Sequence, residues 1–376
     1  MKIKSSSLKV GQKFSEPLFF EDGKNMFLAQ DCAVRKSHLE VISRWDISFL
    51  ITEGHVLKEN EIIPNLDEIE EVEELESLDE VDGYFSVIEE ISDVFENKNT
   101  NQTVDRKTID SAANKIIQNV GDDKISALHF VISESPQFDS YVVSAVNVAI
   151  TSCVMGIELQ FPQKALQALV IAALLHDIGM KYVSEKIVKK KGKLTSEEFE
   201  QLKMHTFKSA KFASDNLLYS REVASIINQH HERWDGTGYP EGRKGSEIAT
   251  TARILSVADA FDAMISTKSY RNSMIAYEAV KNLLRDKGKR FDPTVLKLFI
   301  KCIGVYPVGS YVLLNDDSIA LVSASVLNSP FMPNVKIIKT PASKKNFLHQ
   351  IVKLSEQNDL FIVRALRPEE VVNEKK

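Results

Sequence analysis

A long succession of helical hydrophobic patterns limits most strongly what this chain can fold into. Between about residues 84 and 302, apolar side chains recur with the period of an α-helix, and polar breaks separate one such segment from the next. The segments lie near 84–95, 107–120, 140–156, 164–176, 196–218, 221–231, 249–266, 276–287 and 293–302. No internal repeat of about 20–50 residues runs through them, which argues against a solenoid. The sequence therefore predicts a mainly α fold built around a helical bundle.

The N-terminal region has a different sequence pattern, with short apolar runs instead of helical periodicity. Short apolar runs flank a turn sequence at Glu21–Lys24, as in a β-hairpin, and Ser37–Glu40 has the form of a capping box that opens a short helix. The run Ile47–Ile51 is typical of a closing strand. Residues 1–65 are therefore predicted to form a small α+β domain. Because no residue in it carries obvious chemistry, an accessory or regulatory role is expected.

An acidic segment follows this domain. Residues 66–82 contain ten carboxylates and no basic residue, and their apolar residues recur at every third position. A helix turns in about 3.6 residues, so such a stripe would wind around it instead of staying on one face. The segment is interpreted as a solvated connection in preference to an acidic docking face. Residues 66–134 as a whole are predicted to be an acidic and helical connecting segment.

The C-terminal part of the chain changes to a strand pattern. Apolar runs at 305–314 and 319–322 enclose the polar turn Asn315–Ser318, which predicts a β-hairpin. Residues 335–338 predict a further strand. Residues 303–376 are therefore predicted to be a β-rich C-terminal extension.

Composition and charge bound the functional class. The formal net charge is −6 and the sequence pI about 5.9, so no basic face is indicated and a nucleic-acid polymer is not a predicted partner. Cys32, Cys153 and Cys302 are far apart and are interpreted as reduced packing residues. The first residues lack the apolar run of a signal peptide, and Ala165–Leu175 is shorter than the ~20 residues of a bilayer span. A cytoplasmic protein without membrane insertion is predicted.

Histidine and aspartate side chains with metal-ligand character are spread along the helical stretch. They are His176, Asp177, His205, His230, His231 and Asp259. A His-Asp pair at a helix end, or two adjacent histidines, would each be ordinary alone. Asp259, however, lies in an apolar helix, where a lone buried carboxylate costs several kcal/mol unless it is paired or ligated. Imidazole and carboxylate suit Fe, Mn and similar divalent ions, and this set exceeds one tetrahedral site but fits two metals bridged by a carboxylate.

The segment His230–Pro240, HHERWDGTGYP, resembles the HHE–GYP signature of the HD-GYP family of cyclic di-GMP phosphodiesterases. The resemblance continues through Leu174–Gly179, Lys191–Thr195, Met204-His205, Ala252–Met264 and Ser269–Arg271. It covers about residues 135–302 and implies an HD-superfamily helical bundle, a metal-dependent phosphohydrolase domain, over that range. The N-terminal domain is similar to a small domain that precedes some HD-GYP domains, and Gly304–Gly309 to their C-terminal extension.

The resemblance implies a site of two divalent metal ions, with Fe or Mn favoured, that hydrolyses a phosphodiester bond of cyclic di-GMP. In this interpretation Asp177 bridges the two ions. His176 and Asp259 would be the other ligands of the first ion. The other ligands of the second ion would be His205, His230 and His231. The implied product is linear pGpG, with GMP left open.

Further residues are candidates for substrate contact. Lys268 and Arg271 lie one helical turn apart, so both can face one phosphate, although ordinary surface cations would have the same spacing. Asp262 follows Asp259 by one turn and can hydrogen-bond substrate or orient a metal ligand. A helix-surface carboxylate is the alternative for this residue.

The signature loop contains Gly238, Tyr239 and Pro240. Gly236 and Gly238 permit a tight loop, and Pro240 stiffens its exit. Tyr239 would then be presented near the cleft or on a surface for partners. In the family this loop is associated with contact to GGDEF domains, which synthesise the messenger, and a homodimer is left open.

Three positions depart from the family pattern. Ser144 stands where the family's first histidine is expected, and Ser140 where members with three metals have a glutamate. The family usually reads HDIGK, whereas this chain has Met180 and places the lysine at Lys181. A third metal is therefore not expected, and one of the two ions is short of a ligand. These departures keep a second hypothesis open, a catalytically weak protein that senses cyclic di-GMP or scaffolds partners.

Overall fold

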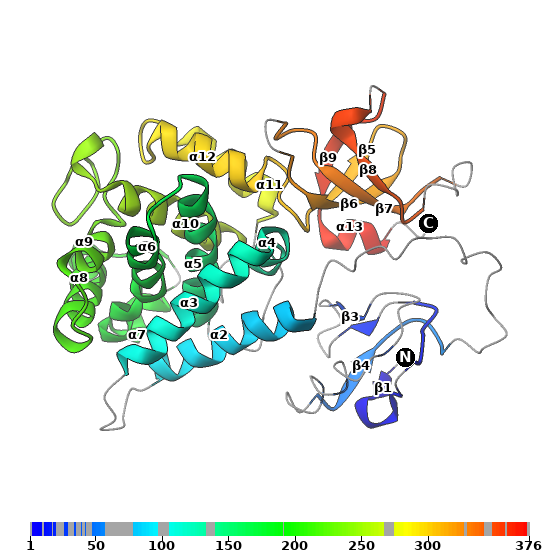
Figure 1. Ribbon diagram of the computed structural model, residues 1–376, viewed down its shortest axis with the longest axis horizontal. Coiled ribbons are helices and arrows are strands. Elements are labelled where there is room, and N and C mark those ends of the chain that lie inside the picture. The colour runs from blue at the N-terminus through cyan, green and yellow to red at the C-terminus, as the bar shows by residue number, and fades with distance from the viewer. Residues whose placement is uncertain are drawn as a thin grey trace. The chain divides into compact units, whose positions relative to one another are not determined.

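The computed structural model describes most of the chain. The described residues are 2–9, 11–16, 18–19, 26–28, 34, 39, 42, 47–56, 78–96, 105–132, 140–190, 192–266, 274–326, 329–341, 348–357 and 359–373. They belong to two compact units, Met1–Leu78 and Asp79–Lys376 (Figure 1).

The N-terminal unit is built on a small antiparallel sheet. Its strands, in the order β1-β4-β2-β3, are β1 (Lys2–Lys4), β4 (Phe49–Ile51), β2 (Leu18–Phe19) and β3 (Met26–Leu28). Leu18 pairs with Leu28 across the predicted hairpin, and the predicted closing strand is β4, so the sheet of this small domain is confirmed. The helix predicted from Ser37 lies largely outside the described residues, as does the acidic segment before Leu78.

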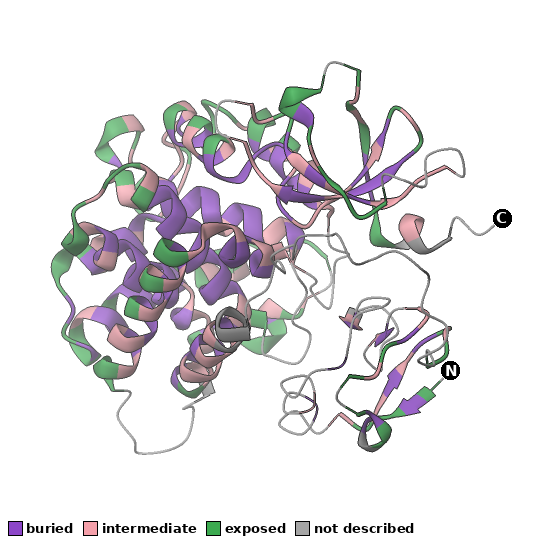
Figure 2. Ribbon diagram, turned by 45° about the vertical axis from the view of Figure 1, so that its right-hand side comes forward, coloured by how far each residue is buried: buried purple, intermediate pink, exposed green. Residues whose placement is uncertain are grey.

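The second unit contains the predicted helical bundle. Its longer helices are α2 (Leu78–Glu96), α3 (Arg106–Asp122), α4 (Lys124–Ile132), α5 (Ser140–Glu158), α6 (Gln163–Leu175), α8 (Ser196–Lys211), α9 (Arg221–Gln229), α10 (Thr250–Ile265), α11 (Ala276–Arg285) and α12 (Pro293–Ile303). Apolar side chains from all of these helices form one hydrophobic core, which is the buried centre of the bundle in Figure 2. The mainly α fold predicted from the periodicity is therefore confirmed.

Helices α5 and α6 form the centre of this bundle. Nearly every side chain of α5 from Val142 to Gly156 is buried, and α5 packs against α6, α10 and α3. Both α5 and the segment Gln163–Tyr182, which contains α6, are long and apolar enough to cross a membrane. However, 78% and 67% of their apolar windows are buried inside the protein. Their hydrophobicity is therefore that of core helices, and the cytoplasmic location stays a prediction.

The predicted connecting segment is built into the same core. Residues 66–134 include α2, α3 and α4, and Ile88, Ile109 and Phe130 from these helices are buried in the core of the bundle. The first helices after the acidic segment therefore belong structurally with the central ones. The boundary at residue 134 stays a prediction.

The start of α8 sets the position of a predicted ligand. Thr195 Oγ1 accepts a hydrogen bond from Glu198 N at 3.2 Å, and Glu198 Oε2 accepts one from Thr195 N at 2.7 Å. This capping box satisfies two backbone N–H groups that would otherwise lack partners at the helix end. It fixes where α8 begins, and hence the turn of the helix on which His205 lies.

The C-terminal part of this unit is a five-stranded antiparallel sheet. Its strands, in the order β8-β7-β6-β5-β9, are β8 (Ile351–Lys353), β7 (Asn334–Lys339), β6 (Ile319–Ala324), β5 (Tyr311–Leu314) and β9 (Ile362–Leu366), and α13 (Pro368–Asn373) follows. Leu313 pairs with Ile319 across the predicted hairpin. Tyr306 stacks on Tyr277 of α11 with ring centroids 5.0 Å apart, which ties the sheet to the helices. The predicted β-rich extension is confirmed.

The two cysteines among the described residues take no part in any site. Cys153 and Cys302 are free and buried, and burial raises the pKa of each thiol to about 12. A thiol with so high a pKa is unreactive at neutral pH, so both are packing residues, as predicted. Cys32 lies outside the described residues.

Candidate metal centre

Four helices bring the six predicted ligands together. His176 directly follows α6 and His230 directly follows α9, whereas His205 lies on α8 and Asp259 on α10. The ring centroid of His230 is 5.2 Å from that of His176 and 5.5 Å from that of His205. The potential ligand atoms of His205, His230 and His231 all lie within 4.8 Å of one another. Residues far apart in the sequence thus converge on one point.

Three of the histidines are oriented by their own helices. In each, Nδ1 lies within hydrogen-bond distance of the backbone carbonyl three residues earlier: His176 to Ala173 O at 2.7 Å, His205 to Leu202 O at 2.7 Å and His230 to Ile227 O at 2.6 Å. A carbonyl oxygen only accepts, so Nδ1 must carry a proton. The other ring nitrogen, Nε2, is therefore the one left to act as a ligand.

The Nε2 atoms of these three histidines make the site suitable for a metal. All three are buried, and none has a hydrogen-bond partner within the part of the chain that the structure describes. A buried polar atom left without a partner costs about 1–3 kcal/mol. A divalent cation that accepts the three lone pairs removes this cost, so the residues present fit a metal centre.

Two carboxylates complete the cluster. Asp177 places Oδ1 at 3.3 Å from His205 Nε2 and Oδ2 at 3.8 Å from His176 Nε2, so its carboxylate lies between the two imidazoles. Asp259 Oδ1 lies 3.8 Å from His176 Nε2. The side chains of Asp177 and Asp259 keep 23% and 14% of their surface exposed, while His176 has none. The cluster is therefore open to solvent on its carboxylate side.

The charges in the cluster shift its pKa values in opposite directions. Burial lowers the pKa of His176, but the carboxylates of Asp177 and Asp259 outweigh it and raise this pKa to about 9. Burial lowers the pKa of His231 to about 3, against the attraction of Asp259 and with repulsion from His205 and other cations. Burial likewise holds the pKa of His230 well below its usual value. Two of the imidazoles are thus neutral at pH 7, the form that binds metals.

The turn that carries Asp177 is pressed against α8. Residues Ile178–Tyr182 form a short 3-10 helix, and Gly179 N donates a hydrogen bond to Ser209 Oγ at 2.8 Å. A Cβ atom on Gly179 would lie 2.3 Å from His205 O and 2.8 Å from Ser209 N. Only glycine allows this close approach, which brings Asp177 to His205.

Gly179→Ala should therefore destabilise the protein and disturb the cluster. The added methyl meets backbone atoms that cannot move aside, and overpacking of this kind costs about 1–3 kcal/mol. Gly121→Ala is the matched control, because Gly121 lies exposed in α3 with no atom near its Cβ position, and alanine there should stabilise by up to about 1 kcal/mol. Thermal unfolding of both variants checks the opposite signs. An equal or higher unfolding temperature for Gly179→Ala would contradict the prediction.

The signature loop is fixed by a buried glutamate. Glu232 is 3% exposed, and its two carboxylate oxygens accept hydrogen bonds from Glu241 N at 2.8 Å and Arg243 N at 3.0 Å. Gly236 has a φ of +82°, and a Cβ atom on Gly238 would lie 2.3 Å from Arg233 N. The first glycine is thus needed for its backbone conformation and the second for close approach.

This loop places Tyr239 against the histidine cluster. Tyr239 N donates to His231 O at 3.2 Å, and the rings of these two residues lie 4.9 Å apart. Burial raises the pKa of the Tyr239 hydroxyl, and the nearby carboxylates of Asp177 and Asp259 add to the effect. Tyr239 was predicted to lie either near the cleft or on a surface for partners, and in the structure it lies against the histidine cluster. Pro240 follows it at the loop exit.

Two cations beside the cluster were not identified from the sequence. Arg290 is brought near by backbone pairing, since Trp234 N donates to Arg290 O at 3.0 Å, and its charge acts on both His231 and Tyr239. Lys203 Nζ lies 5.7 Å from the ring centroid of Tyr239. Lys203 lies two residues before His205, which is a weak sequence signal that it is near the site. Arg290 approaches the site through a contact between distant segments, so no local sequence signal indicates it.

Asp262 is held inside the protein. It is 1% exposed, so the alternative of a helix-surface carboxylate is wrong. Its oxygens accept hydrogen bonds from Ser144 Oγ at 2.6 Å, Asn147 Nδ2 at 3.1 Å and Ser266 Oγ at 3.1 Å. Ser144, at the position of the family's first histidine, is thus engaged with Asp262. The side chains of Lys268 and Arg271 lie outside the described residues, so their contact with a phosphate stays a prediction.

Comparison with known proteins agrees with this arrangement. A family model described as an HD domain matches residues 129–295, and one described as a KOW domain associated with HD domain matches residues 311–374. The chain is 33% identical over 236 residues to a cyclic di-GMP phosphodiesterase of Pseudomonas aeruginosa, covering 62% of this chain and 57% of that protein. It is 27% identical over 337 residues to a cyclic di-GMP phosphodiesterase of Borreliella burgdorferi, covering 89% and 85%.

A solved structure supports the fold. It is an HDG"Y"P protein from Bdellovibrio bacteriovorus, similar with a TM-score of 0.50 and 18% sequence identity over 80% of this chain and 97% of that one. Residues 129–295 therefore form an HD domain and residues 311–374 a KOW domain associated with HD domain, and the segment His230–Pro240 within the HD domain resembles the HD-GYP signature.

Proposed function

We propose that this protein is a phosphodiesterase that hydrolyses cyclic di-GMP with two divalent metal ions. The observation that carries the proposal is the set of three buried Nε2 atoms, without a hydrogen-bond partner among the described residues, that converge beside two carboxylates. The relatives from Pseudomonas aeruginosa and Borreliella burgdorferi, which are named for this activity, support the choice of substrate. The first of these matches spans 57% of its relative's length.

The ligands divide naturally between two ions. Asp177 lies between His176 and His205, and this position supports a bridging role for its carboxylate. His176 and Asp259 would hold one ion, and the group His205, His230 and His231 would hold the other. Two such ions, when bound, would lower the pKa of a water molecule shared between them and would polarise the phosphate oxygens. Mixed imidazole and carboxylate ligands favour Fe or Mn.

The remaining groups at the site would orient the substrate. Arg290 places positive charge beside the cluster, where the phosphates of cyclic di-GMP would bind, whereas Lys203 Nζ is paired with Glu200 Oε1 at 2.7 Å. Tyr239 covers His231 and limits the access of water from that side. The product of the first cleavage is linear pGpG, and GMP would follow if the linear product is bound again.

Metal analysis combined with a hydrolysis assay tests this function. Protein purified without oxygen should contain two equivalents of metal, and chelation should abolish the conversion of cyclic di-GMP to pGpG, with Mn²⁺ or Fe²⁺ restoring it. Three equivalents would contradict the two-metal proposal, since Ser144 is engaged with Asp262 and Ser140 has no carboxylate to offer. A fully loaded protein that leaves the nucleotide intact would contradict the activity.

Metal affinity should rise with pH because of His176. The pKa of about 9 means that the metal-free protein holds an extra proton on His176 at pH 7, and a metal ion must displace it. The apparent affinity should therefore increase about tenfold per pH unit between pH 6 and 8 and level off above about pH 9. His230 and His231 add nothing here, because their low pKa values leave them neutral throughout this range. Titration with Mn²⁺, followed by the EPR signal of the free ion, measures the slope, and a pH-independent affinity would contradict it.

A second candidate function is a catalytically weak protein that binds cyclic di-GMP as a sensor. Met180 favours it, because this residue cannot supply the positive charge that the family's lysine would bring. In that case the metal-loaded protein would bind the nucleotide without turning it over. Contact of the signature loop with GGDEF domains and a homodimer are proposals compatible with either function.

A further inference from the structure

A chain of buried hydrogen bonds links three helices behind the metal centre. Tyr84 on α2 donates its hydroxyl to Asn147 Oδ1 on α5 at 2.8 Å, and Asn147 Nδ2 donates to Asp262 Oδ1 on α10 at 3.1 Å. Ser144, one turn before Asn147 on α5, donates to Asp262 Oδ2 at 2.6 Å. Tyr84, Asn147 and Asp262 are 4%, 2% and 1% exposed. The chain therefore lies in a region of low dielectric, where such bonds are strong.

The chain ends on the helix that carries a candidate metal ligand. Asp259 and Asp262 are three residues apart on α10, so any rotation of α10 about its axis moves both carboxylates together. Asp259 Oδ1 lies 3.8 Å from His176 Nε2, and a ligand must be held within about 0.5 Å of its productive position. The carboxylate of Asp262 receives hydrogen bonds from two side chains of α5, the central helix of the core. These bonds fix the rotation of α10 relative to α5.

We propose that Tyr84, Asn147 and Ser144 are positioning residues that act through Asp262 to aim Asp259 at the metal centre. The inference rests on the proposed function only in that Asp259 is taken as a metal ligand. The inference gives Ser144 a role of its own. The family has a metal ligand at this position, whereas the Ser144 hydroxyl donates a hydrogen bond that anchors α10 through Asp262. Tyr84 extends the anchor to α2, the first helix of the second unit.

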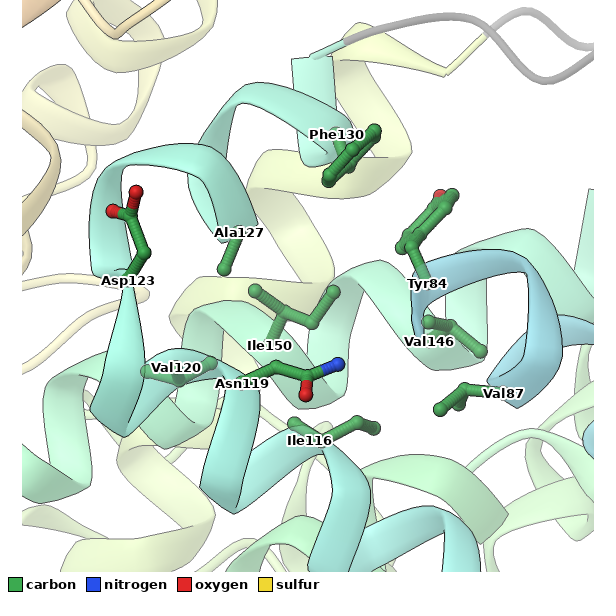
Figure 3. A pocket seen from close by; sticks show the side chains of 10 residues that line it. All are labelled: Tyr84, Val87, Ile116, Asn119, Val120, Asp123, Ala127, Phe130, Val146 and Ile150. Atoms are coloured by element: carbon green, nitrogen blue, oxygen red, sulfur yellow. The ribbon is translucent and has the colours of Figure 1, made fainter. Parts of the chain in front are cut away.

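The surroundings of Tyr84 allow a clean substitution. Its ring stacks on Phe130 with centroids 4.9 Å apart, and both line an apolar cavity with Val87 and Val146 (Figure 3). Phenylalanine at position 84 keeps this ring packing and removes only the hydroxyl. Asn147 then loses one hydrogen-bond donor, and its side chain is less restrained where it meets Asp262.

Tyr219→Phe is the matched control. Tyr219 is buried to 6% exposure, and its hydroxyl donates to Asp110 at 2.8 Å, so the same substitution removes a tyrosine hydrogen bond of the same length from the same unit. Asp110 lies on α3, which carries none of the candidate metal ligands. Both variants should lose similar amounts of thermal stability. They should differ in metal affinity, which depends on the orientation of the Asp259 carboxylate.

The experiment is a Mn²⁺ titration of the full chain and its Tyr84→Phe, Ser144→Ala and Tyr219→Phe variants, paired with cyclic di-GMP kinetics. We expect Tyr84→Phe and Ser144→Ala to bind the ion assigned to His176 and Asp259 about tenfold less tightly, the low end for groups that orient metal ligands. Their kcat should fall while KM for the nucleotide stays unchanged, and Tyr219→Phe should match the wild type. Unchanged metal affinity in Tyr84→Phe and Ser144→Ala would overturn the inference.

The titration separates this inference from the proposed function. A wild type that binds two ions but does not hydrolyse cyclic di-GMP would refute the substrate, and the Mn²⁺ affinities would still support or overturn the positioning role. A wild type that binds no metal would overturn both. Equal loss of metal affinity in all three variants would indicate general destabilisation and would also overturn the inference.

Discussion

Asp177→Ala should empty both metal positions at once and lower the rate of cyclic di-GMP hydrolysis by at least about a thousandfold. The Asp177 carboxylate reaches toward His205 with one oxygen and toward His176 with the other, so a single side chain serves both halves of the cluster. Loss of both ions removes several kcal/mol of transition-state stabilisation, and each 1.4 kcal/mol is about tenfold in rate. Elemental analysis of the purified variant, with a hydrolysis assay, measures both effects.

A matched aspartate variant controls for the loss of charge. Asp215→Ala removes an exposed carboxylate that follows α8 and is not a candidate ligand, and it should keep both ions and full activity. Retention of one ion by Asp177→Ala would show that this carboxylate does not bridge. Circular dichroism of the metal-free variants should remain that of the wild type, because the helices that carry the ligands are held by the apolar core.

Met180→Lys should raise the turnover number about a hundredfold while leaving nucleotide affinity nearly constant. Met180 N donates to Asp177 O at 2.8 Å, so position 180 lies one turn after Asp177 at the start of the 3-10 helix. A cation there would stabilise charge that develops on the phosphate in the transition state, and one such group is worth about 2.7–4 kcal/mol. Steady-state kinetics with saturating metal measures kcat and KM separately.

Lys181 does not replace the missing cation. Its Nζ lies 4.6 Å from the ring centroid of Phe212 and 5.5 Å from that of Tyr182, so its charge is directed at aromatic rings. Met332→Lys, the same change at an exposed site outside the HD domain, is the control and should leave the rate unchanged. Abolition of activity by Lys181→Ala would show that Lys181 already supplies the charge. Absence of turnover in both the wild type and Met180→Lys, with metals loaded, would favour the sensor function.

The helices that could be predicted either have a clear apolar face or, like α5 and α6, are long apolar runs. α3, α9 and α11 keep a polar side toward water, and the periodicity reveals them. α4 was missed because its sequence, KISALHFVI, is apolar on most sides and has no distinct period. β8 and β9 were also missed, since they are short edge strands with no alternating hydrophobic pattern. Their pairing depends on neighbours that are distant in the sequence.

The candidate site likewise combines residues that a local sequence motif indicates with contacts between distant segments that no motif indicates. The candidate ligands could be named from the sequence because they stand in motifs that resemble those of the HD-GYP family. The burial of Asp262 could not, because it depends on Ser144 and Asn147, which are 118 and 115 residues away in the chain. Arg290 likewise approaches the cluster only through backbone pairing with Trp234. Contacts of this kind follow from the packing of the whole bundle and leave no local pattern.

The bonds from Nδ1 of the three histidines to their own helices bear on which metal the cell inserts. These bonds need only the helices, so the imidazoles are aimed before any ion arrives, and folding and metal loading are separate steps. A small zinc module differs, because its folding free energy comes from the ion. A preformed site of this kind binds zinc more tightly than iron(II) or manganese at equal free concentrations. Competition among the ions available at the time of loading, more than the shape of the fold, would then decide which metal occupies the site.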